Sequence, residues 1–270
     1  MNPNWRRLIL SMAVLIGCAP LVLAAEDTLT KEQMKEFLLN AKVIKSSQSK
    51  KGVTNPWHLV LSNGTTTHDG SFQSIDEHKP SMQFGNGQVE YNFVDSYKYN
   101  IAAYALAELL GIEDMLPVYV ERKWQGHVGS LSWWLPVKMD EGERLKKKLS
   151  APDPDAWNKQ MYRVRVFDSL VYDTDANLTN VLIGEDWKIW RVDFSRAFRL
   201  SENIQDPKDL VQCNRQLFTK LKALDSNELM QKTKGYLTKL EAQAVMARRD
   251  KIVTYFNKLI AQNGENAVLY

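Results

Sequence analysis

The pattern of apolar and polar positions divides the chain into a strand-rich first half and a largely helical second half. Two short runs, WHLVLSNG at 57–64 and TTTHDGSFQSID at 65–76, meet at an Asn-Gly turn signal and predict an antiparallel hairpin. The segment at 116–136 has the same character and predicts a second pair of strands. Between them, the apolar residues of IAAYALAELLG at 101–111 recur at helical spacing and end at a glycine suited to a helix C-terminus.

The other segments complete this outline. Residues 28–42 predict a short helix with Thr30 as its N-cap, and the stretch HKPSMQFGNGQ at 78–88 is expected to form a mobile loop. A helix is expected to start near Pro154, and the chain is expected to be helical from about residue 206 to its end. The change of pattern places the join between the halves near 136–143 and predicts an α+β fold.

The first 25 residues are set apart by their composition. Arg6 and Arg7 precede an apolar run that ends in small residues at Ala24 and Ala25, which is the arrangement of a secretory signal. The same run contains LIGC, ending at Cys18, which resembles a bacterial lipobox whose cysteine becomes lipidated. A cleaved signal, a lipoprotein and an uncleaved anchor are three interpretations, in that order, and the run is marginal for spanning a bilayer. All three predict export across the cytoplasmic membrane of a bacterium to the periplasm, with membrane contact only through the leader or a lipidated cysteine.

Charge and cysteine content exclude several classes of function. The chain has 270 residues and a formal net charge of +3, which falls further when the two arginines of the leader are removed. This balance gives no basis for a nucleic-acid partner. Beyond the leader the only cysteine is Cys213, so the sequence excludes an intramolecular disulfide and a zinc–thiolate site there. Cys213 is therefore expected to be a small buried hydrophobe.

The densest group of polar side chains lies in YDTDANLTNVLIGEDWKIWRVDF at 172–194. Asp173, Asp175 and Asn177 alternate like the first ligands of an EF-hand calcium loop. That loop needs a glycine at its sixth position and a glutamate at its twelfth, where this sequence has a leucine and a glycine. A calcium-stabilised secreted domain is therefore the weakest of the hypotheses.

A second spacing in the same stretch is typical of phosphoryl transfer. Asp175 is followed five residues later by Asn180, a spacing in which the aspartate orients or deprotonates an attacking hydroxyl and the asparagine binds magnesium. After a predicted short hairpin comes Asp193, at the place of a second metal-binding aspartate. Asp175 is thus the candidate catalytic base. Asn180 and Asp193 are the candidate ligands of Mg²⁺ or Mn²⁺, bound together with ATP or another nucleotide.

The loop TDANLTNVLI resembles the catalytic loops of HipA-type kinases and phosphoinositide kinases, and IWRVDFSRAFRL is similar to the metal-binding segment of secreted Golgi casein-kinase-type enzymes. The specific motifs lie between residues 161 and 200. The resemblance implies a two-lobed protein-kinase-like fold, with an N-lobe at 26–138 made of a small antiparallel sheet and one helix. A mainly helical C-lobe at 139–270 would carry the catalytic and metal loop, residues 172–199, at the cleft between the lobes.

The resemblance also suggests roles for the neighbouring polar residues. Asn177 would be an auxiliary residue of the catalytic loop. Asp173 is either a hydrogen-bonding orienter or a surface residue. Arg196 and Arg199 either pair with phosphate or with the catalytic loop, or are ordinary surface arginines.

The lysine–glutamate pair expected of a kinase N-lobe is missing. The predicted strand at 65–76 corresponds by layout to the strand that carries the lysine and has Gln73 at that position, and Asn100 stands where the helix would supply the glutamate. Glu108, lower on that helix, is expected to face solvent. Lys50 and Lys51 are candidate phosphate contacts, with a solvated polar loop as the alternative. Loss of both charges beside an intact metal motif predicts altered nucleotide positioning or weakened activity.

Two hypotheses about function follow from these patterns. The first is an exported kinase-like protein that binds nucleotide and divalent metal and transfers a phosphoryl group to a protein or small-molecule acceptor. The second is a catalytically inactive pseudokinase that serves as an interaction module of the cell envelope. The acceptor is not predicted, because a fold and a metal motif do not determine it.

Overall fold

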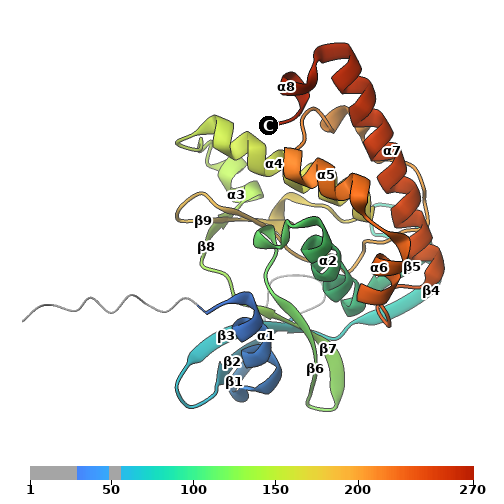
Figure 1. Ribbon diagram of the computed structural model, residues 1–270. Helices are drawn as coiled ribbons and strands as arrows, with labels where there is room; N and C mark the ends of the chain where they lie inside the picture. Colours follow the sequence, from blue (N-terminus) through green and yellow to red (C-terminus); the bar gives the residue numbers. More distant parts are fainter. Residues whose placement is uncertain (1–28, 49–55) are drawn as a thin grey trace, which may run out of the picture.

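The computed structural model describes residues 29–48 and 56–270, so the leader with Cys18 and the loop with Lys50 and Lys51 lie outside the described residues. Figure 1 shows a sheet-rich N-terminal part below a helical C-terminal part, with helix α2 (Tyr97–Leu110) near the junction. This arrangement confirms the α+β fold predicted from the sequence.

The N-terminal part is built on a five-stranded antiparallel sheet in the order β1-β2-β3-β7-β6. Helix α1 (Lys31–Asn40) has Thr30 as its N-cap, as predicted. It packs on the sheet where Phe37 meets Trp133 edge-on, with the ring centres 5.7 Å apart. Arg122 donates to two backbone carbonyls at the end of this helix, at 2.5 and 2.6 Å. The strands are β1 (Lys42–Gln48), β2 (Trp57–Ser62), β3 (Thr67–Gln73), β6 (Tyr119–Trp124) and β7 (His127–Trp133).

The two faces of this sheet differ in character. The face toward α1 is apolar and buried, and complete burial of each of its large side chains contributes roughly 1.5–3 kcal/mol. Its core residues are Leu59, Leu61, Phe72 and Leu131. Directly paired residues of antiparallel strands share a face, and the pairs on the opposite face of this sheet are polar. These pairs include Ser71 with Ser132 and Gln73 with Ser130.

A separate two-stranded hairpin is formed by β4 (Asp76–Gln83) and β5 (Val89–Ser96). The prediction of a mobile loop at 78–88 is therefore wrong, because only the turn at its end is a loop. In that turn the N–H of Phe84 donates to the carbonyl of Gln88 at 2.8 Å. The strand β4 gave no periodic signal because its side chains are almost all exposed. The hairpin leads directly into α2.

The C-terminal part begins with a small antiparallel sheet in the order β10-β9-β8 and is otherwise helical. Helix α4 starts as predicted, with Asp153 as its cap and Pro154 as its first residue. Cys213 is buried, also as predicted, and burial raises the pKa of its thiol to about 12. The strands are β8 (Val137–Asp140), β9 (Val181–Gly184) and β10 (Ile189–Arg191), and the helices are α3 (Glu141–Lys146), α4 (Pro154–Val171), α5 (Arg215–Ala223), α6 (Ser226–Lys232), α7 (Lys239–Asn263) and α8 (Glu265–Val268).

Glu108 does not occupy the exposed position predicted for it. Only 19% of its side chain is exposed, and it forms ion pairs with Lys35 of α1 and Lys232 of α6. The Nζ of Lys232 lies 3.1 Å from its carboxylate. One carboxylate therefore ties α2 to helices of both parts. Helical spacing places Glu108 off the apolar face but does not reveal cations that distant elements bring to it.

Within the ranges that the structure describes, no helix combines the length and the apolar character needed to cross a membrane.

Candidate functional site

The loop that follows α4 brings Asp175 and Asn180 together. The helix ends at Tyr172, whose left-handed backbone (φ of 51°) turns the chain away from the helix axis. Asn177 then caps a short 3-10 helix, Leu178–Asn180, by accepting a backbone N–H at 2.9 Å. The side-chain amide of Asn180 donates to the carbonyl of Asp175 at 3.2 Å, so its side-chain oxygen points away from that carbonyl.

Asp193 lies immediately beside this loop. The N–H of Val192 donates to the carbonyl of Asn180 at 3.0 Å, so the segment after β10 runs alongside the end of the loop. Asp193 has a left-handed backbone with a φ of 60°, which is uncommon for a residue other than glycine and is found preferentially at functional sites. Its N–H lies 3.5 Å from the hydroxyl of Tyr119, whose strand partner is Ser132. The polar face of the five-stranded sheet therefore faces this group.

Arg191, which no sequence motif singled out, joins these elements. Its buried side chain donates to Asp168 of α4 at 3.0 Å and also to Asp173. The other oxygen of Asp173 accepts the backbone N–H of Asp175 at 2.9 Å. Of the two alternatives for Asp173, the structure thus supports the hydrogen-bonding orienter, and its bond to Arg191 makes it unsuitable as a calcium ligand. Sequence spacing gives no signal for Arg191, because its carboxylate partners lie 23 and 18 residues away.

One guanidinium therefore serves two carboxylates in a buried environment. Burial raises the pKa of Asp173 to about 6, the charge of Arg191 opposes this rise, and the nearby Asp168 adds to it. Burial also raises the pKa of Asp168. Burial alone would lower the pKa of Arg191, but the negative charges of the two carboxylates outweigh this effect and raise the pKa. Arg191 therefore stays charged, and protons taken up on acidification go to the carboxylates.

Gln73 and Asn100 form a neutral pair at the positions where the resemblance calls for lysine and glutamate. The Nδ2 of Asn100 donates to the Oε1 of Gln73 at 2.9 Å. The Oδ1 of Asn100 accepts the backbone N–H of Phe194 at 2.7 Å. Asn100 is only 1% exposed, so this amide attaches α2 directly to the segment that carries Asp193. The structure brings the two predicted residues together, and their contact with a nucleotide stays a prediction.

Arg196 and Arg199 are held by the β4–β5 hairpin. Both pair with Glu90 of β5, and Arg199 lies 2.7 Å from that carboxylate. Arg199 also lies 3.4 Å from the hydroxyl of Thr174 in the loop that follows α4. The two arginines are therefore not ordinary surface residues, since each has a defined carboxylate partner.

The donor set suits a magnesium or manganese ion. The side-chain oxygens of Asn180 and Asp193 are hard donors, which these ions prefer. Among the described residues, no group of three or more His, Cys, Asp or Glu side chains could hold a metal ion. Mg²⁺ typically takes one or two carboxylates and completes its shell with phosphate and water oxygens. The two residues therefore fit an ion that binds together with phosphates.

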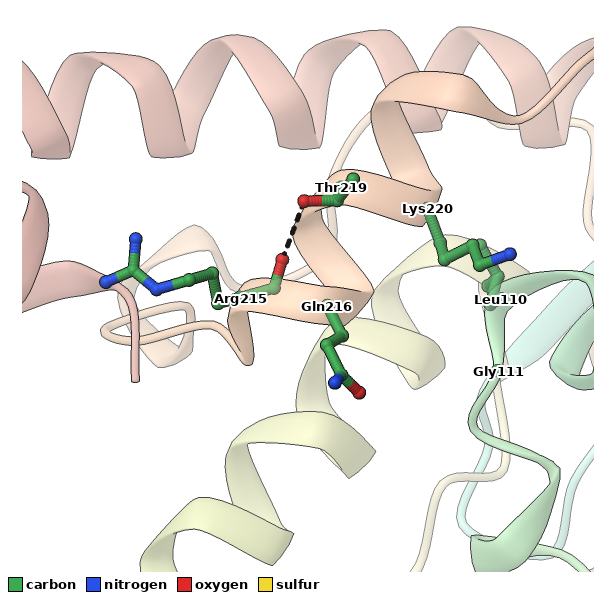
Figure 2. Close-up of a pocket in the computed structure, with 6 residues that line it drawn as sticks. All are labelled: Leu110, Gly111, Arg215, Gln216, Thr219 and Lys220. Carbon is green, nitrogen blue, oxygen red and sulfur yellow. Dashed lines mark hydrogen bonds between the residues drawn. The ribbon is translucent and has the colours of Figure 1, made fainter.

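A hollow of about 410 Å³ lies elsewhere, between the end of α2 and α5 (Figure 2). Leu110 and Gly111 line one side of it, and Lys220 of α5 extends toward them. Leu110 is ten residues beyond Asn100 in α2, which corresponds to about 15 Å along the helix. This hollow is therefore separate from the group around Asp193.

Comparison with known proteins connects this arrangement to kinases. No family model and no curated protein matches the chain. Among solved structures, hydra Fam20 with sugar superposes with a TM-score of 0.65 and 13% identity, over 88% of this chain and 91% of the other. The Golgi casein kinase gives a TM-score of 0.63 and 13% identity, over 88% and 77%.

Two further solved structures extend the comparison. The Golgi casein kinase with Mn/ADP bound gives a TM-score of 0.60 and 12% identity, over 88% of this chain and 78% of the other. The Helicobacter pylori proinflammatory kinase CtkA gives 0.51 and 9%, over 84% and 98%. Similarity at such low identity shows the fold and leaves activity open. The chain therefore has a protein-kinase-like fold, as the resemblance of its motifs predicted.

Proposed function

We propose that this protein binds a nucleotide together with Mg²⁺ or Mn²⁺ and transfers a phosphoryl group to an acceptor. The observation that carries the proposal is the backbone bond from Val192 to Asn180, which sets Asn180 beside Asp193. Asp175 lies at the other end of the same hydrogen-bonded loop. The neighbouring structure with Mn/ADP bound supports this choice of ligands.

Each residue of the group has a role in this proposal. Asn180 and Asp193 would hold the ion through their side-chain oxygens, and the ion, when bound, neutralises charge on the phosphates. Asp175 orients the acceptor hydroxyl and accepts its proton at a carboxylate oxygen. Asp173, held by Arg191, fixes the backbone of Asp175. Positioning of this kind supplies much of what phosphoryl transfer requires.

The neutral pair of Gln73 and Asn100 favours a second candidate function. A lysine at the position of Gln73 would attract the phosphates, whereas an amide attracts them only weakly. The neutral side chain of Asn100 also holds the backbone N–H of Phe194, with no charge involved. A pseudokinase that binds nucleotide, turns it over slowly or not at all, and serves as an interaction module of the cell envelope fits this observation.

We also propose that the protein is exported, on the basis of its first 25 residues. Its acceptor would then be a protein or small molecule outside the cytoplasm.

A turnover assay separates the two candidate functions. The purified protein is incubated with γ-labelled ATP and Mn²⁺, and label transfer to added proteins and to water is measured beside nucleotide binding. If the protein is a kinase, the wild type is expected to transfer label. The Asp175→Asn variant is expected to transfer label at least about 100-fold more slowly and to keep its nucleotide affinity. Asp155→Asn, which changes an exposed aspartate of α4, is the matched control. Binding without any transfer would identify the pseudokinase, and absence of binding would refute both.

A further inference from the structure

The β4–β5 hairpin carries one carboxylate, that of Glu90, which pairs with both Arg196 and Arg199. Glu90 of β5 pairs with Arg196 and lies 2.7 Å from Arg199. The exposed fractions of the three side chains are only 20%, 15% and 12%. Two guanidinium groups at such a position require an anion, because burial of an unpaired charge is costly.

The hairpin also holds this segment through its backbone. The N–H of Ser96 donates to the carbonyl of Ser195 at 2.8 Å. Arg199 donates to the carbonyl of Val94, again at 2.8 Å. The strand β5 therefore runs against the chain just after Asp193 and fixes it through the backbone of Ser195 and the side chain of Arg199.

Arg196 connects the hairpin with the catalytic loop. Its guanidinium lies 5.0 Å from the ring centre of Phe84 and 5.1 Å from that of Phe93, both within cation–π distance. Its backbone carbonyl accepts from Thr174, from the N–H at 3.3 Å and from the hydroxyl at 3.1 Å. The hairpin thus holds the side chain of Arg196, and the backbone of Arg196 in turn holds Thr174 in the loop of Asp175.

The ion pairs leave hydrogen-bonding atoms of all three side chains unsatisfied, including the Oε1 of Glu90. Three nitrogens of the arginines are buried with no hydrogen-bond partner among the described residues: Nε of Arg196, and Nε and Nη1 of Arg199. A carboxylate offers two oxygens, whereas a tetrahedral oxyanion offers four in a geometry that suits arginine forks. Activation loops of kinases are ordered in this way when an added phosphate pairs with arginines.

We propose that Glu90 is a positioning residue that acts as a built-in substitute for such a phosphate. It holds residues 193–199 in the metal-binding arrangement, so the segment needs neither phosphorylation nor a partner protein to become ordered. The consequence for metal and nucleotide binding rests on the proposed function. The ordering of residues 193–199 does not rest on the proposed function, because it is measurable in the protein without ligand.

Amide hydrogen exchange over residues 193–200 tests this inference. We expect exchange in Glu90→Gln to be about tenfold faster than in the wild type, since the segment opens locally. Glu77→Gln is the matched control, because Glu77 lies on the same hairpin in an exposed ion pair with Lys79 at 2.6 Å. Sodium sulfate, but not sodium chloride of equal ionic strength, is expected to restore slow exchange in Glu90→Gln. The double variant Glu90→Gln/Arg196→Gln is expected to lose this response.

The outcomes that overturn the inference are equally defined. Exchange in Glu90→Gln equal to that in Glu77→Gln would overturn it, as would a destabilised segment that sulfate does not restore. If Glu90→Gln does not fold, Glu90→Asp keeps the charge and is expected to fold with near wild-type exchange. Failure of both variants to fold would assign Glu90 to stability alone and also overturn the inference. Sulfate-dependent ordering without binding of Mn²⁺ and ADP would refute the proposed function and leave the inference standing.

Discussion

Asn100 shows how a single amide connects the sheet, α2 and the segment that carries Asp193. It donates to Gln73 and accepts from the backbone of Phe194, so both ends of its side chain are used. A glutamate could accept from Phe194 but could not donate to an amide oxygen. The sequence identified this position through the layout of strands and helix. It could not reveal the bond to Phe194, because the two residues are 94 positions apart.

Asn100→Ala is expected to lower the free energy of unfolding by about 1–3 kcal/mol, because it leaves the buried N–H of Phe194 without a partner. Urea unfolding of the purified variant measures the effect. Ser130→Ala is the control, since its hydroxyl lies at the longer distance of 3.4 Å from the same amide and its loss should cost less than about 1 kcal/mol. Equal stability of the wild type and Asn100→Ala would show that the amide does not hold the segment.

At the scale of elements, the sequence predicted best what is local. The loop that carries Asp175 and Asn180, the hairpin β9–β10 and the start of α4 follow from turn, cap and spacing signals within a few residues. The hairpin β4–β5 was not predicted, because the side chains of β4 are almost all exposed and give no alternation of apolar and polar positions. Arg191 was not predictable for a different reason, since its partners Asp168 and Asp173 lie on α4 and the following loop, 23 and 18 residues away in the sequence.

The buried group of Asp168, Asp173 and Arg191 predicts an unusual dependence of stability on pH. Burial raises the pKa of Asp173 from 3.8 to about 6, so the folded protein holds this proton more tightly than the unfolded chain. The resulting stabilisation is complete below pH 3.8 and is lost as the pH rises through about 6. Over that range the wild type should lose up to about 3 kcal/mol relative to Asp173→Asn, which has no proton to lose there.

Urea unfolding of both proteins at about pH 4 and pH 7 measures this difference. Comparison of the two proteins at each pH removes the titration of groups that they share. A difference in stability that stays constant with pH, or that shifts in favour of the wild type as the pH rises, would contradict the raised pKa of Asp173.

At the scale of the whole molecule, the fold is retained although about seven residues in eight differ from those of its structural neighbours, as the 13% identity shows. The motif around Asp175, Asn180 and Asp193 predicted the fold when taken with the hairpin inside it and the layout of strands and helices, because kinase folds carry these oxygen donors in that order. The sequence could not show which elements hold the motif in place, since Asn100, Arg191 and the β4–β5 hairpin act across long separations.

The central claim is that Asn180 and Asp193 hold a divalent ion together with a nucleotide. Calorimetric titration of ADP into the protein, with Mn²⁺ and with a chelator, tests it most directly. We expect binding that requires Mn²⁺ and is at least about tenfold weaker in Asp193→Asn, since even loss of an outer-shell partner of a metal ligand costs about 10–100-fold in affinity. Asp209→Asn, which alters an exposed aspartate, is expected to bind like the wild type. Absence of binding, or ADP binding that depends neither on Mn²⁺ nor on Asp193, would contradict the claim.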